Sequence, residues 1–215
     1  LDGMRLQNLA GHRGRAISCE VIATFLPRVV LDSIFSVLKK AGLETANITL
    51  EPIAAINAIV PIEMRRLNIV LVDVGAGTSD LAISRDGVVF AYGMVPEAGD
   101  EITECICAQY LVDFEVGEYI KRAVNSSAQI SFKDIWEKPH TVASGSVMEI
   151  IRPAVKKLAF SIAAAALELN GGKPQAVIAV GGGALTPGLL EELAAQCGLP
   201  AQKVGIRLPS AIKGL

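Results

Sequence analysis

A turn in the middle of the chain carries the residues best suited to chemistry. Asp73 follows a β-branched run that ends at Val72, the composition of a buried strand. The turn after it consists of Val74, Gly75, Ala76, Gly77 and Thr78. Glycines let a ligand approach the backbone, and successive N–H groups in such a turn form a concave anion site. A carboxylate beside that site fits a divalent cation held between it and a phosphate, whereas the alternative is a plain polar hairpin turn.

A second glycine-rich loop lies much later in the chain. A short apolar run, 176–180, predicts a buried strand, and three consecutive glycines follow it at 181–183. A helix is expected next, over 189–197. A strand, glycines and a helix in this order let a flat base or a phosphate pack against the backbone. A loop that only joins strand to helix would not require three glycines in a row.

Two predicted helices bring further charged side chains. Glu51 precedes Pro52 at the start of a helix over 53–59, after a short strand predicted at 48–50. Its carboxylate either complements the helix dipole or points into a cleft and orients an attacking water. Glu118 and Lys121 lie one turn apart on a helix predicted over 114–124. They either form a surface ion pair or line a nucleoside pocket.

The elements that must position these residues favour an α/β protein. The chain has 215 residues, of which 51% are hydrophobic and only 5% aromatic, and such a composition suits buried sheets. The hairpin strand resumes at Leu81, and another strand is expected over 88–92. Further strands are predicted at 16–24 and near 129–132, and further helices over 28–41, 100–111 and 147–170, with Asp100 as the N-cap of the helix over 100–111.

Composition also excludes several classes of function. The formal net charge is −2, which gives no electrostatic basis for nucleic-acid binding. The longest apolar run, 158–167, is too short to span a bilayer and is expected to be a buried helix. The four cysteines lack zinc-site spacing and are expected to be reduced thiols in a cytoplasmic protein.

The two glycine-rich motifs together resemble those of a known superfamily. D-x-G-x-G-T-[ST]-D, at 73–80, is similar to the second phosphate-binding hairpin of the actin-like ATPases, which include actin, DnaK-type chaperones, sugar kinases and the division protein FtsA. V-G-G-G-A-x-T-P-G-L, at 180–189, resembles their adenosine motif, and E-P-x-A-A at 51–55 precedes the hairpin in the expected order. The stretches that narrow the resemblance to the FtsA family are 1–3 with 11–14, 38–58, 147–169 and 199–215.

This resemblance implies an actin-like ATPase (ribonuclease H-like) fold in two parts. Residues 1–66 would be a partial first domain, made of the end of an FtsA-type inserted subdomain and the passage to the catalytic helix. Residues 67–215 would be a nearly complete second domain, with 100–146 as its smaller subdomain. The superfamily's first phosphate loop, a final helix and an amphipathic membrane tail find no counterpart in the sequence. The chain is therefore expected to be a fragment of a longer protein.

The resemblance also implies a site for ATP and magnesium. Asp73 would hold magnesium through water, and Glu51 would orient the attacking water as the catalytic residue. The nucleoside would pack on Gly182, Gly183 and Leu185, opposite Glu118 and Lys121. The phosphates would be bound by Gly75, Ala76, Gly77 and Thr78.

The function implied is that of a polymerising scaffold in bacterial cell division. Such a protein self-associates into filaments and links a tubulin-like division-ring protein to the membrane, which it reaches only through partners or a segment absent from this sequence. The intact protein would be a weak ATPase at most, and this piece would bind ATP weakly or not at all. The alternatives are a small-molecule kinase of the same superfamily and a non-hydrolysing adaptor like the pilus-assembly relatives of FtsA.

Overall fold

The computed structural model describes residues 1–4, 6, 10–19 and 21–207 of the chain. It divides into two compact units, Leu1–Ile48 and Thr49–Leu215. The last residues of the predicted second domain, 208–215, lie outside the described part, as does residue 20 of the predicted strand 16–24. The proposed boundary between domains at 66 and 67 stays a prediction.

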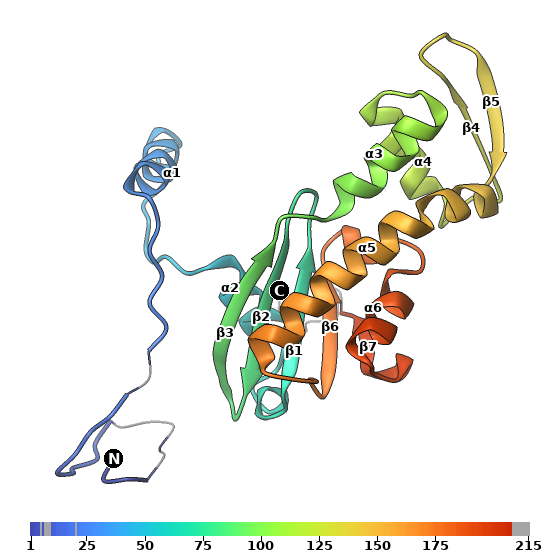
Figure 1. Ribbon diagram of the computed structural model, residues 1–215. Helices are drawn as coiled ribbons and strands as arrows, with labels where there is room; N and C mark the ends of the chain where they lie inside the picture. The colour runs from blue at the N-terminus through green and yellow to red at the C-terminus, as the bar shows by residue number, and fades with distance from the viewer. Residues whose placement is uncertain (5, 7–9, 20, 208–215) are drawn as a thin grey trace. The chain divides into compact units, whose positions relative to one another are not determined.

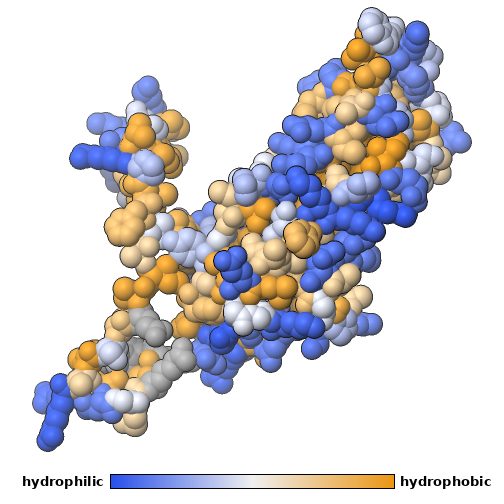
Figure 2. Space-filling model, in the orientation of Figure 1, coloured by the Kyte–Doolittle hydropathy of each residue, from blue (hydrophilic) through white to orange (hydrophobic). Residues whose placement is uncertain are grey.

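The first unit contains the helix α1 (Arg28–Lys40), which confirms the helix expected there. None of its residues is buried, and Figure 2 shows apolar side chains among the charged ones on its surface. The strand predictions at 16–24 and 48–50 are wrong for the described residues, which lie outside any helix or strand there. Apolar β-branched residues such as Val21 and Ile48 are exposed in these stretches. A strand is stable only when it pairs with another strand and packs on a core, and the described residues here do neither.

The second unit is built on a five-stranded sheet with the order β3-β2-β1-β6-β7 (Figure 1). The strands β1 (Ile69–Val74), β2 (Ser79–Arg85) and β3 (Val88–Val95) form an antiparallel meander, which confirms the predicted hairpin. The strand β6 (Ala176–Val180) pairs in parallel with β1 and lies where the sequence predicts it. The edge strand β7 (Val204–Ile206), parallel to β6, was not predicted.

Helices cover both faces of this sheet. Successive apolar side chains of β1 point to opposite faces, so each face needs a cover. Ile69 and Leu71 belong to a core cluster with residues of α2 (Glu51–Ile59). Val70 and Val72 belong to the larger cluster, which includes residues of α5 (Ser144–Asn170) and α6 (Leu189–Cys197). The helix α2 begins at Glu51, two residues before the predicted start, with Pro52 in its first turn.

A smaller lobe extends from the end of β3 and is joined to the sheet along α5 (Figure 1). It consists of α3 (Gly99–Tyr110), α4 (Phe114–Ala123) and the hairpin of β4 (Gln129–Lys133) and β5 (Pro139–Ala143). The short 3₁₀ helices of the unit are η1 (Met64–Arg66), η2 (Gly183–Leu185) and η3 (Ala201–Lys203). Over the described residues, no helix combines the length and the apolar character needed to cross a membrane.

The start of α3 differs from the sequence prediction. Asp100 is not the N-cap, because the helix begins at Gly99 and Ala98 precedes it. The Ala98 amide donates instead to the Glu101 carboxylate at 2.7 Å, so the third residue of the helix reaches back to satisfy its start. The Asp100 amide, in the first turn of α3, donates to the Ala76 carbonyl.

Candidate functional site

The two glycine-rich segments meet because the strands that precede them are parallel neighbours. Asp73 near the end of β1 is the ladder partner of Val180 at the end of β6. Parallel strands present their carboxyl ends at the same edge of a sheet, and ligands of open α/β sheets bind outside such edges. The turn at 75–78, here called the tip turn, and the segment 181–185, here called the glycine loop, therefore leave the sheet side by side.

The glycines divide into two kinds by what surrounds them. A Cβ atom on Gly181, whose φ is +85°, would lie 2.4 Å from both the Asp73 carboxylate and the Val74 carbonyl oxygen. A Cβ on Gly183 would lie 2.9 Å from the Val74 carbonyl oxygen. These two positions require glycine because the glycine loop packs tightly on the end of β1. A Cβ on Gly182, in contrast, would meet no atom within 4 Å, so its backbone is open to a ligand.

The tip turn is held by backbone hydrogen bonds within itself and from α3. The Gly75 amide donates to the Thr78 carbonyl at 2.9 Å. The Gly75 carbonyl accepts from the Gly99 amide at 3.2 Å, and the Ala76 carbonyl accepts from the Asp100 amide at 2.8 Å. Two of the turn's carbonyls are thus tied to the first residues of α3.

Carboxylates gather beside the tip turn. Burial raises the pKa of Asp73 above its usual value, and the negative charges of Glu51 and Asp80 raise it further. The Thr78 hydroxyl donates to the Asp80 carboxylate at 3.2 Å, which braces the turn. A cation in this position would relieve the repulsion among the three carboxylates.

The donor set fits magnesium brought by a phosphate ligand. Over the described part of the chain, no group of three or more histidine, cysteine, aspartate and glutamate side chains is arranged to hold a metal ion by itself. Mg²⁺ is commonly bound by one or two carboxylates together with substrate phosphates and water. Asp73, half-buried beside the glycine-rich tip turn, has the chemistry of such a carboxylate.

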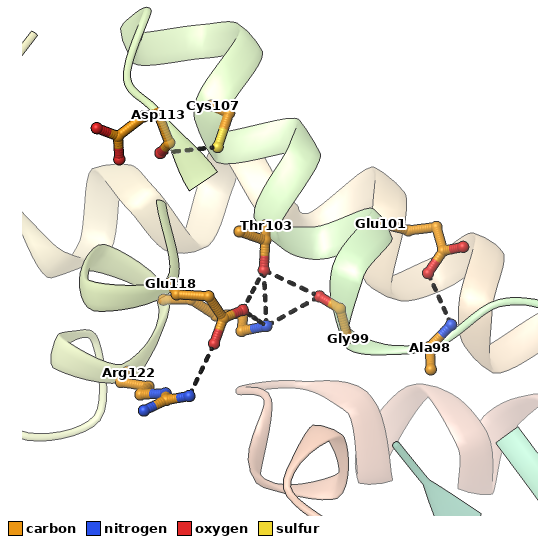
Figure 3. Close-up of polar contacts among 9 residues, drawn as sticks. Ala98, Gly99, Glu101, Thr103, Cys107, Asp113, Glu118 and Arg122 are labelled. Atoms are coloured by element: carbon orange, nitrogen blue, oxygen red, sulfur yellow. Dashed lines mark hydrogen bonds and ion pairs between the residues drawn. The ribbon is translucent and has the colours of Figure 1, made fainter. Parts of the chain in front are cut away.

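A network of charges lies between α3 and α4 (Figure 3). The Glu118 carboxylate accepts from the Thr103 hydroxyl and pairs with Lys121 and, at 3.1 Å, with Arg122. The Lys121 ammonium also donates to the Gly99 carbonyl at 2.9 Å and to the Thr103 hydroxyl at 2.7 Å. Burial acts to raise the pKa of Glu118, but the hydrogen bonds and positive charges outweigh it and hold that pKa below its usual value.

An open hollow of about 580 Å³ lies along α4 on the other side of Glu118. It is lined by Phe114, Glu115, Glu118, Tyr119, Arg122, Ala123, Ser126 and Ser127. Lys121 is not among these residues, whereas Arg122, which the sequence analysis did not single out, is. The signal that could have found Arg122 is its place beside Lys121, one helical turn after Glu118. The segment after α4 reaches the glycine loop, since the Asn125 side-chain amide donates to the Leu185 carbonyl at 2.9 Å.

The structure therefore brings most of the predicted site residues to one region of the second unit. The tip turn contacts the start of α3, the glycine loop packs on the end of β1, and the Glu118 network joins α3 to α4. Glu51 lies near enough to Asp73 to influence its pKa. The ligand roles assigned to these residues stay predictions.

Comparisons with known proteins agree with this architecture. A sequence model of the MreB/Mbl protein family matches residues 22–215. Cell division protein FtsA of Pseudomonas aeruginosa is 24% identical over 227 residues, covering 100% of this chain and 51% of that protein. The chain thus spans about half the length of this curated relative.

Two solved structures have similar folds. MreB5 of Spiroplasma citri bound to ADP superimposes with a TM-score of 0.64 at 21% identity, covering 85% of this chain and 61% of that chain. The PilM–PilN type IV pilus biogenesis complex gives a TM-score of 0.66 at 20% identity, covering 85% of this chain and 48% of that chain.

Proposed function

The chain belongs to the MreB/Mbl protein family and has the actin-like ATPase fold, and from this premise we propose that it forms part of the ATP site of an FtsA-type protein of bacterial cell division. The observation that carries the proposal is the parallel pairing of Asp73 with Val180. It sets two glycine-rich segments side by side, with the backbone at Gly182 open to a ligand.

The phosphate end of the site is assigned to the tip turn and its carboxylates. Ala76, Gly77 and Thr78 offer backbone N–H groups to the outer phosphates, while the Gly75 amide, bonded to the Thr78 carbonyl, shapes the turn. Asp73 holds magnesium through water, and the metal supplies neutralisation of phosphate charge. Glu51, at the exposed start of α2, orients a water molecule.

The nucleoside end is assigned to the glycine loop and α4. Gly182 and Leu185 pack against adenosine, and Leu185, 51% exposed, offers apolar surface for a base, while the buried Gly183 lets the loop approach β1. Glu118 and Lys121 of α4 meet the nucleoside from the other side, and Arg122 lies next to them in the hollow on α4. The hydrogen bond from the Asn125 side chain to the Leu185 carbonyl joins the segment after α4 to the glycine loop.

Titration of the ¹⁵N-labelled chain with MgATP tests the assignment. Millimolar MgATP is expected to shift the amide signals of Gly75, Gly77 and Gly182, because these lie along the proposed phosphate and base contacts. Gly172, in the turn between α5 and β6, serves as the control and is expected to stay unshifted. An absence of shifts at the three site glycines at saturating millimolar MgATP contradicts the proposal.

The wider role follows from the family and the FtsA relative. The longer protein is proposed to assemble into filaments with ATP, to bind a tubulin-like division-ring protein, and to act in the cytoplasm at the membrane through partners. Electron microscopy with and without ATP tests filament formation. Phosphorylation of a small molecule would favour the kinase alternative, while neither nucleotide binding nor filaments would favour an adaptor like a pilus-assembly protein.

A further inference from the structure

We propose that Glu97 is a positioning residue whose carboxylate, held by α5, fixes the tip turn through the segment between β3 and α3. This segment, residues 96–98, is here called the link. The inference rests on the proposed function only in taking the tip turn as the phosphate site. Glu97 does not line the hollow on α4 and was not among the site residues predicted from the sequence.

The Glu97 carboxylate is bonded to α5 through both of its oxygens. One oxygen lies 2.7 Å from the Lys157 ammonium, and the other accepts from the Ser161 hydroxyl at 2.8 Å. Lys157 and Ser161 are four residues apart and therefore lie on the same face of α5. The hydrogen bonds from Lys157 and Ser161 hold the pKa of Glu97 below its usual value. At neutral pH the charged carboxylate, whose side chain is only 22% exposed, thus fastens the link to the helix.

The backbone of the link and of the first turn of α3 is bonded to the tip turn. The carbonyl of Glu97 accepts at 2.8 Å from the hydroxyl of Ser79, a fully buried residue that directly follows the tip turn. The Gly99 amide donates to the Gly75 carbonyl at 3.2 Å. The next amide donates to the carbonyl of Ala76 at 2.8 Å. Four consecutive residues, 97–100, therefore connect α5 on one side to the tip turn on the other.

The residues on either side of Glu97 make the link stiff. Pro96 precedes it, and the proline ring fixes the backbone angle φ. Ala98 follows it, is fully buried, and donates its amide to the Glu101 carboxylate at 2.7 Å (Figure 3). A displacement of the Glu97 side chain is therefore expected to move the start of α3 and, with it, the tip turn.

Two adjacent lysines of α5 provide a matched comparison. Both are exposed, Lys156 by 55% and Lys157 by 69%. The Lys156 ammonium lies 3.7 Å from the Glu192 carboxylate of α6, away from the link, whereas the Lys157 ammonium bonds Glu97. Exposed ion pairs contribute little to stability, so exposure alone predicts equally small effects from the two lysines. The positioning role predicts that only the Lys157 pair affects the tip turn.

Amide hydrogen exchange of the ligand-free chain tests this role. Glu97→Ala is expected to speed exchange at Gly99 and Asp100 by about tenfold, because the bonds of these amides to the tip turn open more often. Glu97→Gln keeps the shape and part of the hydrogen bonding, and it is expected to speed exchange by about threefold. Lys156→Met, the control, is expected to change these rates by less than about twofold.

A second variant reaches the same contact from α5. Lys157→Met combined with Ser161→Ala removes both donors and leaves Glu97 in place, and it is expected to act like Glu97→Ala. It decides the outcome if circular dichroism shows that Glu97→Ala has not folded. Unchanged exchange at Gly99 and Asp100 in both variants would overturn the inference, as would an equal acceleration in Lys156→Met.

Ligand binding provides a readout that a purely structural role would not move. Glu97→Ala is expected to weaken binding of inorganic magnesium triphosphate by about tenfold, while adenosine binding changes by less than about twofold. Triphosphate binding that stays unchanged although exchange is faster would overturn the positioning role, and so would an equal loss of adenosine binding. If the unmodified chain binds neither ligand, the proposed function fails, and the exchange rates still decide whether Glu97 fixes the tip turn.

Discussion

Asp73 and Val180, which are far apart in the sequence, are partners in the parallel ladder between β1 and β6. This pairing fixes where the tip turn and the glycine loop leave the sheet. The separation of the two segments is consequently set by the spacing of hydrogen-bonded strands, about 4.8 Å, and not by the loops themselves. A substitution that displaces one of the two segments is therefore expected to displace the other.

The crowding of Gly181 against β1 predicts unequal effects of alanine in the glycine loop. Gly181→Ala is expected to lower the free energy of unfolding by about 1–3 kcal/mol, since it strains a residue with φ of +85° and drives a methyl group into Asp73 and Val74. Gly182→Ala, the matched control, is expected to change it by less than about 0.5 kcal/mol because its methyl group meets open space. Urea denaturation measures both, and equal losses would contradict the packing described.

The raised pKa of Asp73 predicts that Asp73→Asn stabilises the ligand-free protein at pH 7. The folded state holds this proton more tightly than the unfolded state, so the unmodified protein loses stability as pH rises above the usual value of 3.8. The variant should lack that loss. Thermal unfolding from pH 4 to pH 7 measures the difference, with Glu168→Gln as a control at an exposed carboxylate of α5. A variant that is less stable than the unmodified protein at pH 7 would count against the repulsion among the carboxylates.

The lowered pKa of Glu118 predicts the opposite pH dependence. The stabilisation is present at neutral pH and is lost as the pH falls below the usual value of 4.5 and through the folded-state pKa. Glu118→Gln is expected to cost about 1–3 kcal/mol at pH 7, because it leaves Lys121 without its charged partner. Glu149→Gln removes an exposed ion pair with Arg152 and is expected to cost less than about 0.5 kcal/mol. Similar costs in the two variants, measured by denaturation at pH 7, would contradict this distinction.

The packing of α5 predicts a large effect from a single core truncation. Ile162 is fully buried in the main core cluster, and Ile162→Ala is expected to cost about 2–5 kcal/mol. Phe160, two residues earlier, is 61% exposed, and Phe160→Ala should change stability by about 0.5 kcal/mol or less. Calorimetry of both variants separates the buried face of α5 from the exposed one.

The sequence was sufficient to predict the strands and loops whose own residues have a distinctive composition. The β-branched runs at β1 and β6 and the glycines after them predicted both strands and both loops. The strand β7 has three residues and depends on β6 for its pairing, so a local pattern could not identify it. The stretch 16–24 has the opposite problem, because its apolar residues predict a strand, yet its described residues pair with no other strand.

The sequence predicted where the site lies in the chain, but it did not predict which atoms each site residue contacts. Gly182 and Gly183 were predicted to contact the nucleoside, but glycine at 183, as at 181, is already required by the approach of the loop to Val74. Lys121 carries the charge expected beside a nucleotide, and its ammonium also bonds the Gly99 carbonyl, the Thr103 hydroxyl and the Glu118 carboxylate. Neither fact could be derived from spacing along the chain, because each depends on segments brought together by the sheet and by α3.

The long helix α5 has a mechanical consequence for the second unit. Its buried residues run from Val147 to Asn170. The helix therefore packs against the smaller lobe at its start and against the sheet at its end. Pro153 lies inside this helix and removes one of its backbone hydrogen bonds, since proline has no amide to bond the carbonyl one turn earlier. We therefore expect a load applied to the lobe to bend α5 at this turn before it deforms the sheet.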